Sequence, residues 1–417
     1  MSAARKSSFD SELSRRLDAL REQGLHRQLR RFDSAQATHI QSEGRTLLNF
    51  SSNDYLGLAN DPALKAGAHE AVERYGAGSG ASRLICGSLG SHNDLEEALA
   101  DFKGTEAALS FSTGYAAALG TICALVSSKD VIILDKLVHA SIVDAARLSG
   151  AKLRVFAHND VSDLEDILKW ASQRADGTAR PPLVVTESVF SMDGDHAPLR
   201  ELVELKEKYG AWLMVDEAHG TGLYGPNRRG LAEELGVSDQ IEIQMGTLGK
   251  ALGASGGYIC GSRQLIEYLI NRARSFIFST APVPAAAAAA TAGIRCVQTA
   301  EGDQRRKQLW ERVAEIREAL TRADVQLPAG RSAILPLMLG DETKAVETAA
   351  RLLEQGILVP AIRYPTVARG EARLRVTVSA AHSAENVRQL VSALANFKFA
   401  TQARTGALRQ HANSPAS

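Results

Sequence analysis

The chain has 417 residues, a length that favours two or three domains and a large buried core. Its 48 lysines and arginines balance 48 aspartates and glutamates, so no net field attracts it to nucleic acid or anionic lipid. With 45% hydrophobic and 23% charged residues, and four cysteines without a Cys-x-x-Cys pair, the composition excludes collagen, coiled coils, disordered chains, zinc ribbons and disulfide scaffolds.

The N-terminal part, residues 1–50, is predicted to be a helical arm. The first 16 residues are charged from the start and lack the apolar core of a signal peptide, so we expect a cytoplasmic protein. Apolar spacing over residues 10–31, interrupted at Gly24, predicts an amphipathic helix, and residues 47–50 predict a short strand.

Residues 51–297 are predicted to form a large domain. Asn60-Asp61-Pro62 predicts the start of a helix that ends near Tyr75, and a glycine-rich loop follows. Beyond the loop, short apolar runs alternate with helical stretches, which predicts βαβ units and a mainly parallel sheet. The predicted strands are 107–111, 131–134, 153–156, 183–186, 212–215 and 241–244.

Residues 298–398 predict a second, smaller α+β domain. Its predicted elements are a charged helix at 303–322, a strand at 334–339, a helix at 343–355 and strands near 357 and at 373–378. The final residues, 399–417, lack periodicity and are predicted to be a disordered tail. The expected fold class is therefore α/β, a mainly parallel central sheet with a smaller C-terminal α+β domain.

Lys250 is the most informative residue, because it is the only charged side chain between Glu242 and Arg263. Most lysines are solvated surface residues. A single lysine in a neutral, glycine-rich window after a strand instead suggests an amine in a low-dielectric site, where its pKa falls and it can form a Schiff base. Spacing alone leaves both interpretations open.

Asp216 ends the apolar run AWLMVD, so its carboxylate is expected at the C-terminal end of a strand, where open α/β sheets bind ligands. A helix cap or an ordinary strand-end acid is the alternative. LMVDEAH also resembles the acidic strand of a helicase and GTLGKA a phosphate loop. Both are excluded, because no G-x-x-x-x-G-K-[ST] occurs and Ala251 follows the lysine.

Several further residues follow separate predicted strands. Gly114 opens a helix after a strand, so free backbone N–H groups there could hold a phosphate. Each of these residues alone is more often structural, but together they converge on one cleft: Gly114, His139, Ser191, Asp216, His219 and Lys250. A lysine, a carboxylate for a ring nitrogen and a helix N-terminus for a phosphate predict pyridoxal phosphate (PLP) as the cofactor.

The longer motifs strengthen this prediction. They are SSNDYLGLA (51–59), HNDV (158–161), ESVFSMDGD (187–195), VDEAHGTG (215–222) and GTLGKALGASGG (246–257). In wording and order they resemble the α-oxoamine synthases, fold-type I PLP-dependent acyltransferases, from about Leu17 to Phe397. AIRYPTV (361–367) and ARLRVTVSAAH (372–382) are most similar to members that join L-alanine to a pimeloyl thioester in biotin synthesis.

The resemblance implies roles around the cofactor. Lys250 would hold it, Asp216 would pair with its ring nitrogen and His219 would bond its phenolic oxygen. His139 would stack on the ring and donate to the acyl substrate, so Lys250, Asp216 and His139 are the implied catalytic residues. The implied contacts of the ring and phosphate also include Ser191, Gly114, Tyr115, Thr247 and, from a neighbouring subunit, Thr280.

The resemblance also implies partners. Because Thr280 would serve the neighbouring phosphate, a homodimer with shared active sites is expected. L-alanine and either pimeloyl-CoA or a pimeloyl carrier protein are the implied substrates, with no metal, nucleic acid or membrane. The implied substrate-binding residues are Arg27, Asn53, Arg363 and Thr366. In two places the chain departs from the family pattern: Tyr115 replaces a common Phe, and Tyr364 replaces a usual Pro.

Three alternatives stay open at this point. A glycine acetyltransferase, or a synthase with another acyl thioester, would use the same cofactor. A catalytically silent PLP-binding regulatory protein would bind it without turnover. A Rossmann oxidoreductase rests on YGAGSGAS, but those glycines follow a predicted helix instead of a strand, so this interpretation is discounted.

Overall fold

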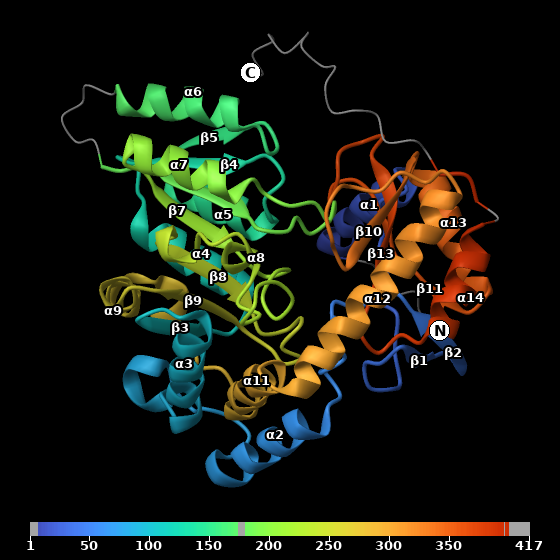
Figure 1. Cartoon of the computed structure of the whole chain (residues 1–417), viewed down its shortest axis with the longest axis horizontal. Coiled ribbons are helices and arrows are strands. Elements are labelled where there is room, and N and C mark those ends of the chain that lie inside the picture. Colours follow the sequence, from blue (N-terminus) through green and yellow to red (C-terminus); the bar gives the residue numbers. More distant parts are fainter. Residues whose placement is uncertain (1–6, 174–179, 396, 400–417) are drawn as a thin grey trace.

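Short apolar runs form the central sheet of the larger of two lobes (Figure 1). The structure, a computed structural model, describes residues 7–173, 180–395 and 397–399. Within these residues the sheet has seven strands in the order β3-β9-β8-β7-β6-β4-β5, and only β9 runs against the others. The strands are β3 (Ala107–Phe111), β4 (Val131–Asp135), β5 (Lys152–Phe156), β6 (Leu183–Glu187), β7 (Trp212–Asp216), β8 (Ile243–Thr247) and β9 (Gly257–Gly261).

The mainly parallel sheet confirms the predicted fold class. Five strands agree with the predicted runs to within one residue, whereas β8 begins two residues later and ends three residues later than predicted. β9 was not predicted, because its sequence GYICG has glycine at both ends and glycine disfavours strands. It forms because β3 and β8 both supply hydrogen-bonding partners along its whole length.

Helices cover both faces of this sheet, and alternate strand residues face opposite sides. In β4, Ile132 and Leu134 join one apolar core, while Val131 and Ile133 join the other. Burying each such side chain contributes roughly 1.5–3 kcal/mol. One core is covered by α4 (Gly114–Leu125), α5 (Ala140–Ser149), α9 (Arg263–Arg272) and α10 (Arg274–Ile277). The other contacts α2 (Pro62–Tyr75), α3 (Gly90–Lys103), α6 (Val161–Ser172), α7 (Leu199–Tyr209), α8 (Leu231–Glu234) and α11 (Pro284–Val297).

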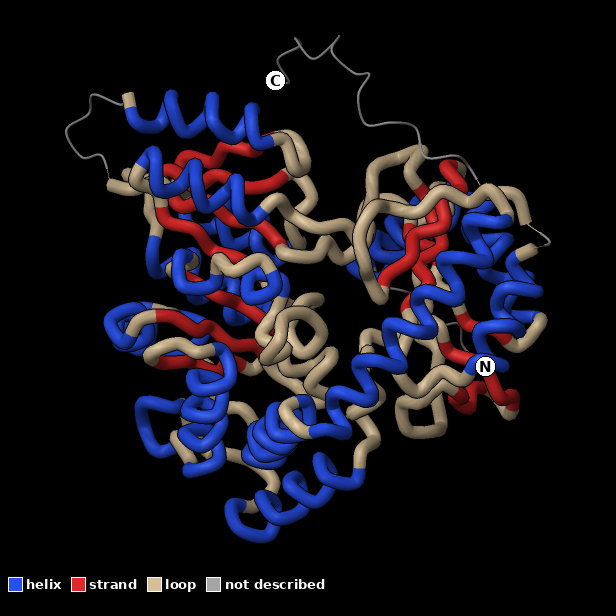
Figure 2. The backbone as a smooth tube through the Cα atoms, viewed as in Figure 1, coloured by secondary structure: helices blue, strands red, loops and turns tan. Residues whose placement is uncertain are grey.

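The smaller lobe is built around an antiparallel sheet (Figure 2). Its strands are β10 (Ile334–Gly340), β13 (Ala372–Thr377) and β12 (Ala361–Ile362), in that order. Its helices are α12 (Ala300–Arg322), α13 (Glu342–Glu354) and α14 (Ala384–Leu394). Figure 1 shows α12 running from the larger lobe, beside α11, into the smaller one. One continuous helix, α12, thus joins the two lobes.

The N-terminal residues connect to the smaller lobe. α1 (Ser8–Glu22) has no buried residue and ends before Gly24, so the predicted helix over 10–31 is shorter than expected. β1 (His39–Ser42) and β2 (Arg45–Asn49) form a hairpin, and β2 also pairs with β11 (Ile357–Leu358). The predicted domain bounds stay a prediction, but this pairing joins the first 50 residues to the C-terminal part.

Two short helical turns complete the described chain. The predicted glycine-rich loop contains a π-helical turn, η1 (Arg83–Gly87), and η2 (Ser238–Gln240) precedes β8. No helix among the described residues is long and apolar enough to cross a membrane. Of the predicted tail, only Phe399 is among the described residues.

Candidate active site

The C-terminal edge of the central sheet brings together residues that are far apart in the sequence. β6 ends at Glu187, β7 at Asp216 and β8 at Thr247, and Glu187 lies opposite Asp216 in the parallel register. Gly114 begins α4 after β3, and His139 caps the N-terminus of α5 after β4. Parallel strands that end at one edge make a ligand site there, so these loops form the candidate active site.

His219 lies between Lys250 and Tyr55, within hydrogen-bonding distance of both side chains. Lys250 Nζ is 2.7 Å from His219 Nε2, and His219 Nδ1 is 2.5 Å from Tyr55 Oη. Burial lowers the pKa of Lys250 to about 8, although the two strand-end carboxylates oppose this shift. Burial, and then the charge of Lys250, hold the pKa of His219 well below its usual value. Near pH 8 the site therefore contains a neutral imidazole beside an amine that is partly neutral and nucleophilic.

The pKa values of Asp216 and Glu187 are both raised, that of Glu187 well above its usual value. Asp216 Oδ1 accepts from the backbone N–H of Ala218 at 2.8 Å, and Glu187 Oε2 accepts from that of Ser191 at 3.2 Å. Burial raises the pKa of both carboxyl groups, and the charge of Lys250 opposes both shifts. Burial and the neighbouring Asp216 carboxylate raise the pKa of Glu187 well above its usual value. Burial therefore disfavours the ionised form of both carboxyl groups, and that of Glu187 more strongly.

His139 has a defined tautomer. Its Nδ1 accepts from the backbone N–H of Ser141 at 3.2 Å and lies 2.8 Å from Ser141 Oγ. Because a backbone N–H can only donate, the neutral ring carries its proton on Nε2. Burial lowers the pKa of His139, which favours this neutral form. His139 Nε2 is thus a hydrogen-bond donor that is not engaged by another described residue.

The N-terminus of α4 offers a place for a phosphate. Its cap, Thr113, uses its side chain to accept one first-turn N–H group, while the N–H groups of Gly114 and Tyr115 bond to no other described residue. A Cβ added to Gly114 would lie 4.0 Å from Thr247 Cβ, so Thr247 borders the same helix end. Free N–H groups and the helix dipole together favour an anion there.

Arg375, which the sequence analysis did not single out, also belongs to the site. It is buried on β13, its Nη1 donates to Asn53 Oδ1 at 3.1 Å and its Nε donates to Ser191 O at 2.6 Å. Its charge contributes to the lowered pKa of Lys250. The available signal was the pair Arg373 and Arg375, which share one face of an otherwise apolar strand.

Three of the four predicted substrate residues form a separate cluster. Arg363 Nη2 donates to His26 O at 3.2 Å, and Arg27 Nη2 lies 3.5 Å from Thr366 Oγ1. These contacts hold the segment after α1 against the loop that follows β12. Asn53, the fourth, lies instead beside Arg375.

Tyr115 and Thr280 make contacts outside the group around Lys250. The Tyr115 side chain is 46% exposed, and its Oη donates to Asp144 Oδ2 at 2.7 Å. Thr280 pairs with Ser82 in an isolated antiparallel bridge, which anchors it to the glycine-rich segment. Because the structure holds one chain, the expected contact of Thr280 with a neighbouring subunit stays a prediction.

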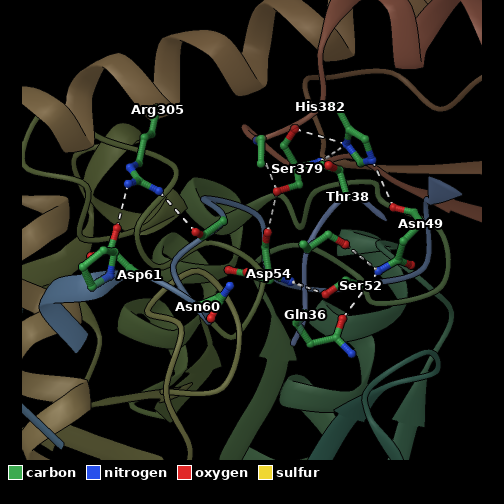
Figure 3. Close-up of a pocket in the computed structure, with 14 residues that line it drawn as sticks. Gln36, Thr38, Asn49, Ser52, Asp54, Asn60, Asp61, Arg305, Ser379 and His382 are labelled. Atoms are coloured by element: carbon green, nitrogen blue, oxygen red, sulfur yellow. Dashed lines mark hydrogen bonds and ion pairs between the residues drawn. The ribbon is translucent and has the colours of Figure 1, made fainter. Parts of the chain in front are cut away.

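A polar cavity of about 250 Å³ lies beside the segment that carries Asn53 and Tyr55 (Figure 3). None of the predicted site residues lines it. Its lining residues brace that segment: Asp54 accepts two backbone N–H groups, Ser379 Oγ donates to Asp54 O at 2.7 Å, and His382 Nε2 lies 3.0 Å from a backbone carbonyl oxygen. The residues around this cavity therefore hold the segment of Asn53 and Tyr55 in place, but the cavity is not the candidate active site.

The residues at the sheet edge fit the expected PLP. Lys250 is an amine of lowered pKa, and Asp216 is a buried carboxylate that can face a ring nitrogen. Gly114 and Tyr115 supply free N–H groups for a phosphate. In addition, Glu187 Oε1 is buried without a hydrogen-bond partner among the described residues, so a polar group is needed to satisfy it.

Comparisons with known proteins agree with this fit. The chain matches the family model of class I and II aminotransferases over residues 45–394. It is 50% identical to an 8-amino-7-oxononanoate synthase of Geobacter sulfurreducens over 91% of this chain and 96% of that protein. A solved structure of serine palmitoyltransferase from S. paucimobilis with bound PLP and myriocin is 31% identical, covers 94% of this chain and 98% of its own, and has a TM-score of 0.86. The crystal structure of an 8-amino-7-oxononanoate synthase from Francisella tularensis is 29% identical over 84% and 97% of the two chains, with a TM-score of 0.71.

Proposed function

Since the chain belongs to the class I and II aminotransferase family and, within it, to the PLP-dependent 8-amino-7-oxononanoate synthases of biotin synthesis, we propose that it condenses L-alanine with a pimeloyl thioester. The thioester is pimeloyl-CoA or a pimeloyl carrier protein. A carbon–carbon bond forms between the alanine Cα and the acyl carbonyl carbon, while the C–S bond and the bond from Cα to the carboxylate break. The products are 8-amino-7-oxononanoate, CO2 and the free thiol.

The observation that carries this proposal is the placement of Lys250, an amine with a pKa lowered to about 8 at the sheet edge that also holds Asp216. Lys250 would attach the cofactor and Asp216 would face its ring nitrogen. When bound, PLP supplies a protonated ring that withdraws electrons from the substrate Cα. The other proposed contacts are His219 at the phenolic oxygen, His139 on the ring face, Ser191 beside it, and Gly114, Tyr115, Thr247 and the neighbouring subunit's Thr280 at the phosphate.

Lys250 is also the proposed base. With the amino acid bound, its Nζ removes the Cα proton and later returns a proton to the same carbon. A pKa of about 8 suits both directions, because the amine is neither fully protonated nor weakly basic at physiological pH. The neutral His219, 2.7 Å from Nζ, adds no positive charge that would depress the amine further.

Arg375 is the proposed partner of the alanine carboxylate, together with Asn53. A guanidinium buried at the site can bind a carboxylate by charge-assisted hydrogen bonds and hold the Cα–H bond in one orientation. The resemblance also implies Arg363 for this carboxylate, and that assignment stays a prediction; its Nη2 donates to His26 O. Arg27 and Thr366 are proposed for the acyl side of the site.

His139 is the proposed donor to the thioester oxygen. Its Nδ1 is held by Ser141, which leaves Nε2–H as the free donor. A preorganised donor at an oxygen that gains charge in the transition state typically contributes about 2.7–4 kcal/mol.

The test is product stoichiometry with L-alanine and pimeloyl-CoA. The proposal requires CO2, free thiol and amino ketone in equal amounts, and borohydride reduction should label the peptide of Lys250. Thiol release without CO2 would indicate simple thioester hydrolysis, and a label on another lysine would contradict the role of Lys250. A glycine acetyltransferase would instead prefer glycine with acetyl-CoA.

A further inference from the structure

His158 lies between two carboxylates at the edge of the candidate site. Its Nδ1 is 2.9 Å from Asp135 Oδ1, and its Nε2 is 2.8 Å from Asp195 Oδ2. A neutral imidazole has only one N–H and cannot donate to both carboxylates, so this geometry requires the protonated ring. Burial alone would lower the pKa of His158, but hydrogen bonds to the two carboxylates override it and raise the pKa to about 10. His158 is therefore a fixed cation at neutral pH.

This cation joins two loops that carry proposed site residues. Asp135 is the last residue of β4, and its Oδ1 also accepts from the backbone N–H of Leu137 at 2.8 Å, two residues before His139. Asp195 belongs to the loop 188–197 between β6 and α7, which carries Ser191. Without His158, the two loops would present two carboxylates to each other.

The neighbouring Asn159 also forms hydrogen bonds with both Asp135 and Asp195. Its backbone N–H donates to Asp135 Oδ2 at 2.9 Å, and its Nδ2 donates to Asp195 Oδ2 at 3.3 Å. Asn159 has φ 56°, a left-handed conformation that asparagine tolerates better than most residues. The backbone bend at this position lets both residues reach the same two carboxylates.

The loop 188–197 is held from its other side by β13. Arg375 Nε donates to Ser191 O, and Arg373 forms an ion pair with Asp193. On the His158 side, the Phe190 ring meets the imidazole edge to face, with 4.4 Å between ring centroids and an interplanar angle of 88°. The position of Ser191 is thus set between the His158 cation and the two arginines.

We propose that His158 is a positioning residue: clamped by Asp135 and Asp195, it ties the loop 188–197 to the end of β4 and so fixes Ser191 relative to His139. His158 makes no hydrogen bond to either residue and acts through Asp195 and the Phe190 ring. The proposal rests on the proposed function, because these positions matter to catalysis only if both residues contact the cofactor or substrate.

The variant H158Q tests this role. It removes the cation and leaves the buried Asp135 and the partly exposed Asp195 without this charged partner, so the loop should move away from β4. Because Arg375 is bonded to this loop, we expect the KM for L-alanine to rise about tenfold or more, while kcat changes less, and the visible circular dichroism of bound PLP to weaken. The double variant H158Q/D195N removes the repulsion and should recover part of both signals.

The matched control is K206Q. Lys206 is also a buried cation between two carboxylates, with Nζ 2.6 Å from Glu242 Oε1 and 2.7 Å from Glu207 Oε1, but it lies at the opposite edge of the sheet. K206Q should lower the melting temperature without changing the KM for alanine or the circular dichroism of PLP. The same result for H158Q would overturn the proposal, as would strictly additive effects in the double variant.

If H158Q does not fold, D195N alone decides. It leaves His158 on Asp135 but weakens the link to the loop 188–197, so the same two signals should change in the same direction. Unchanged KM and circular dichroism in D195N would overturn the positioning role. A wild-type protein that binds PLP but does not turn over alanine would contradict the proposed function alone, because the circular dichroism still reports the loop.

Discussion

At the scale of single residues, burial gives similar side chains different roles. Asp216 and Glu187 occupy paired positions on neighbouring strands, and burial raises the pKa of both; the Asp216 carboxylate adds to the shift of Glu187, while Lys250 opposes both shifts. Lys250 in turn has its pKa lowered to about 8 by burial. The sequence could predict Lys250 and Asp216 from their positions after strands. It could not assign the charges, which depend on burial and neighbours.

The variant Asp216→Asn removes the charge of this side chain while keeping its shape, so it tests the role of the charge alone. The amide has nearly the same size, so the fold and the covalent attachment of PLP should persist. Without the carboxylate the ring nitrogen loses its stabilising charge, and exchange of the alanine Cα proton for deuterium should slow by about a hundredfold or more. Proton NMR in D2O measures this exchange directly. Near-normal exchange would show that Asp216 is an ordinary strand-end acid with no role at the ring nitrogen.

The lowered pKa of Lys250 predicts a pH dependence for cofactor attachment. Only the neutral amine attacks, and its pKa of about 8 reflects burial and the charge of Arg375, opposed by Asp216 and Glu187. The rate constant for PLP uptake by the cofactor-free protein should therefore rise with pH and level off above about pH 9. An ordinary lysine, with a pKa of about 10.4, would still be gaining reactivity at pH 10.

The control for this measurement is a lysine-containing peptide treated with PLP over the same pH range, which corrects for ionisation of PLP itself. After this correction, an uptake rate that keeps rising to pH 10 would show that the amine is not held in a low-dielectric site.

At the scale of elements, periodicity predicted the strands whose buried runs are continuous. The runs at β4, β6 and β7 are almost entirely buried on both faces, and such runs are readily recognised. β9 escaped prediction because tertiary contacts, and not its own residues, make GYICG a strand. Arg375 escaped for a related reason: its bond to Asn53 joins residues 322 positions apart, which no local pattern records.

Gly257→Ala tests how β9 supports the proposed phosphate site. A Cβ at this position would lie 2.6 Å from Gly114 N and Cα, so β9 or the N-terminus of α4 must shift. We expect a loss of about 1–3 kcal/mol of stability and weaker PLP binding, measured by thermal unfolding and by fluorescence titration. The control is Gly78→Ala, whose Cβ would meet no atom within 4 Å. Equal PLP affinity in both variants would show that β9 does not support the phosphate site.

At the scale of the whole molecule, we expect a homodimer, because the resemblance implies that Thr280 contacts the phosphate in a neighbouring subunit. The bridge between Thr280 and Ser82 fixes this segment to the glycine-rich residues of its own chain. A second subunit can then contact Thr280 in a defined position. Light scattering of active protein should give about twice the chain mass of 44.6 kDa. A fully active monomer at assay concentration would rule out a site that needs two subunits.

The choice of L-alanine and a pimeloyl thioester as substrates is the most specific part of the proposed function. The most direct test is a grid of kcat/KM values for L-alanine, glycine and L-serine, each with acetyl, succinyl, pimeloyl and palmitoyl thioesters. One methyl group supplies only about 1–3 kcal/mol of discrimination, so weak activity with glycine is expected. We expect the highest value for L-alanine with pimeloyl-CoA. A higher value for glycine with acetyl-CoA, or for L-serine with palmitoyl-CoA, would contradict this expectation.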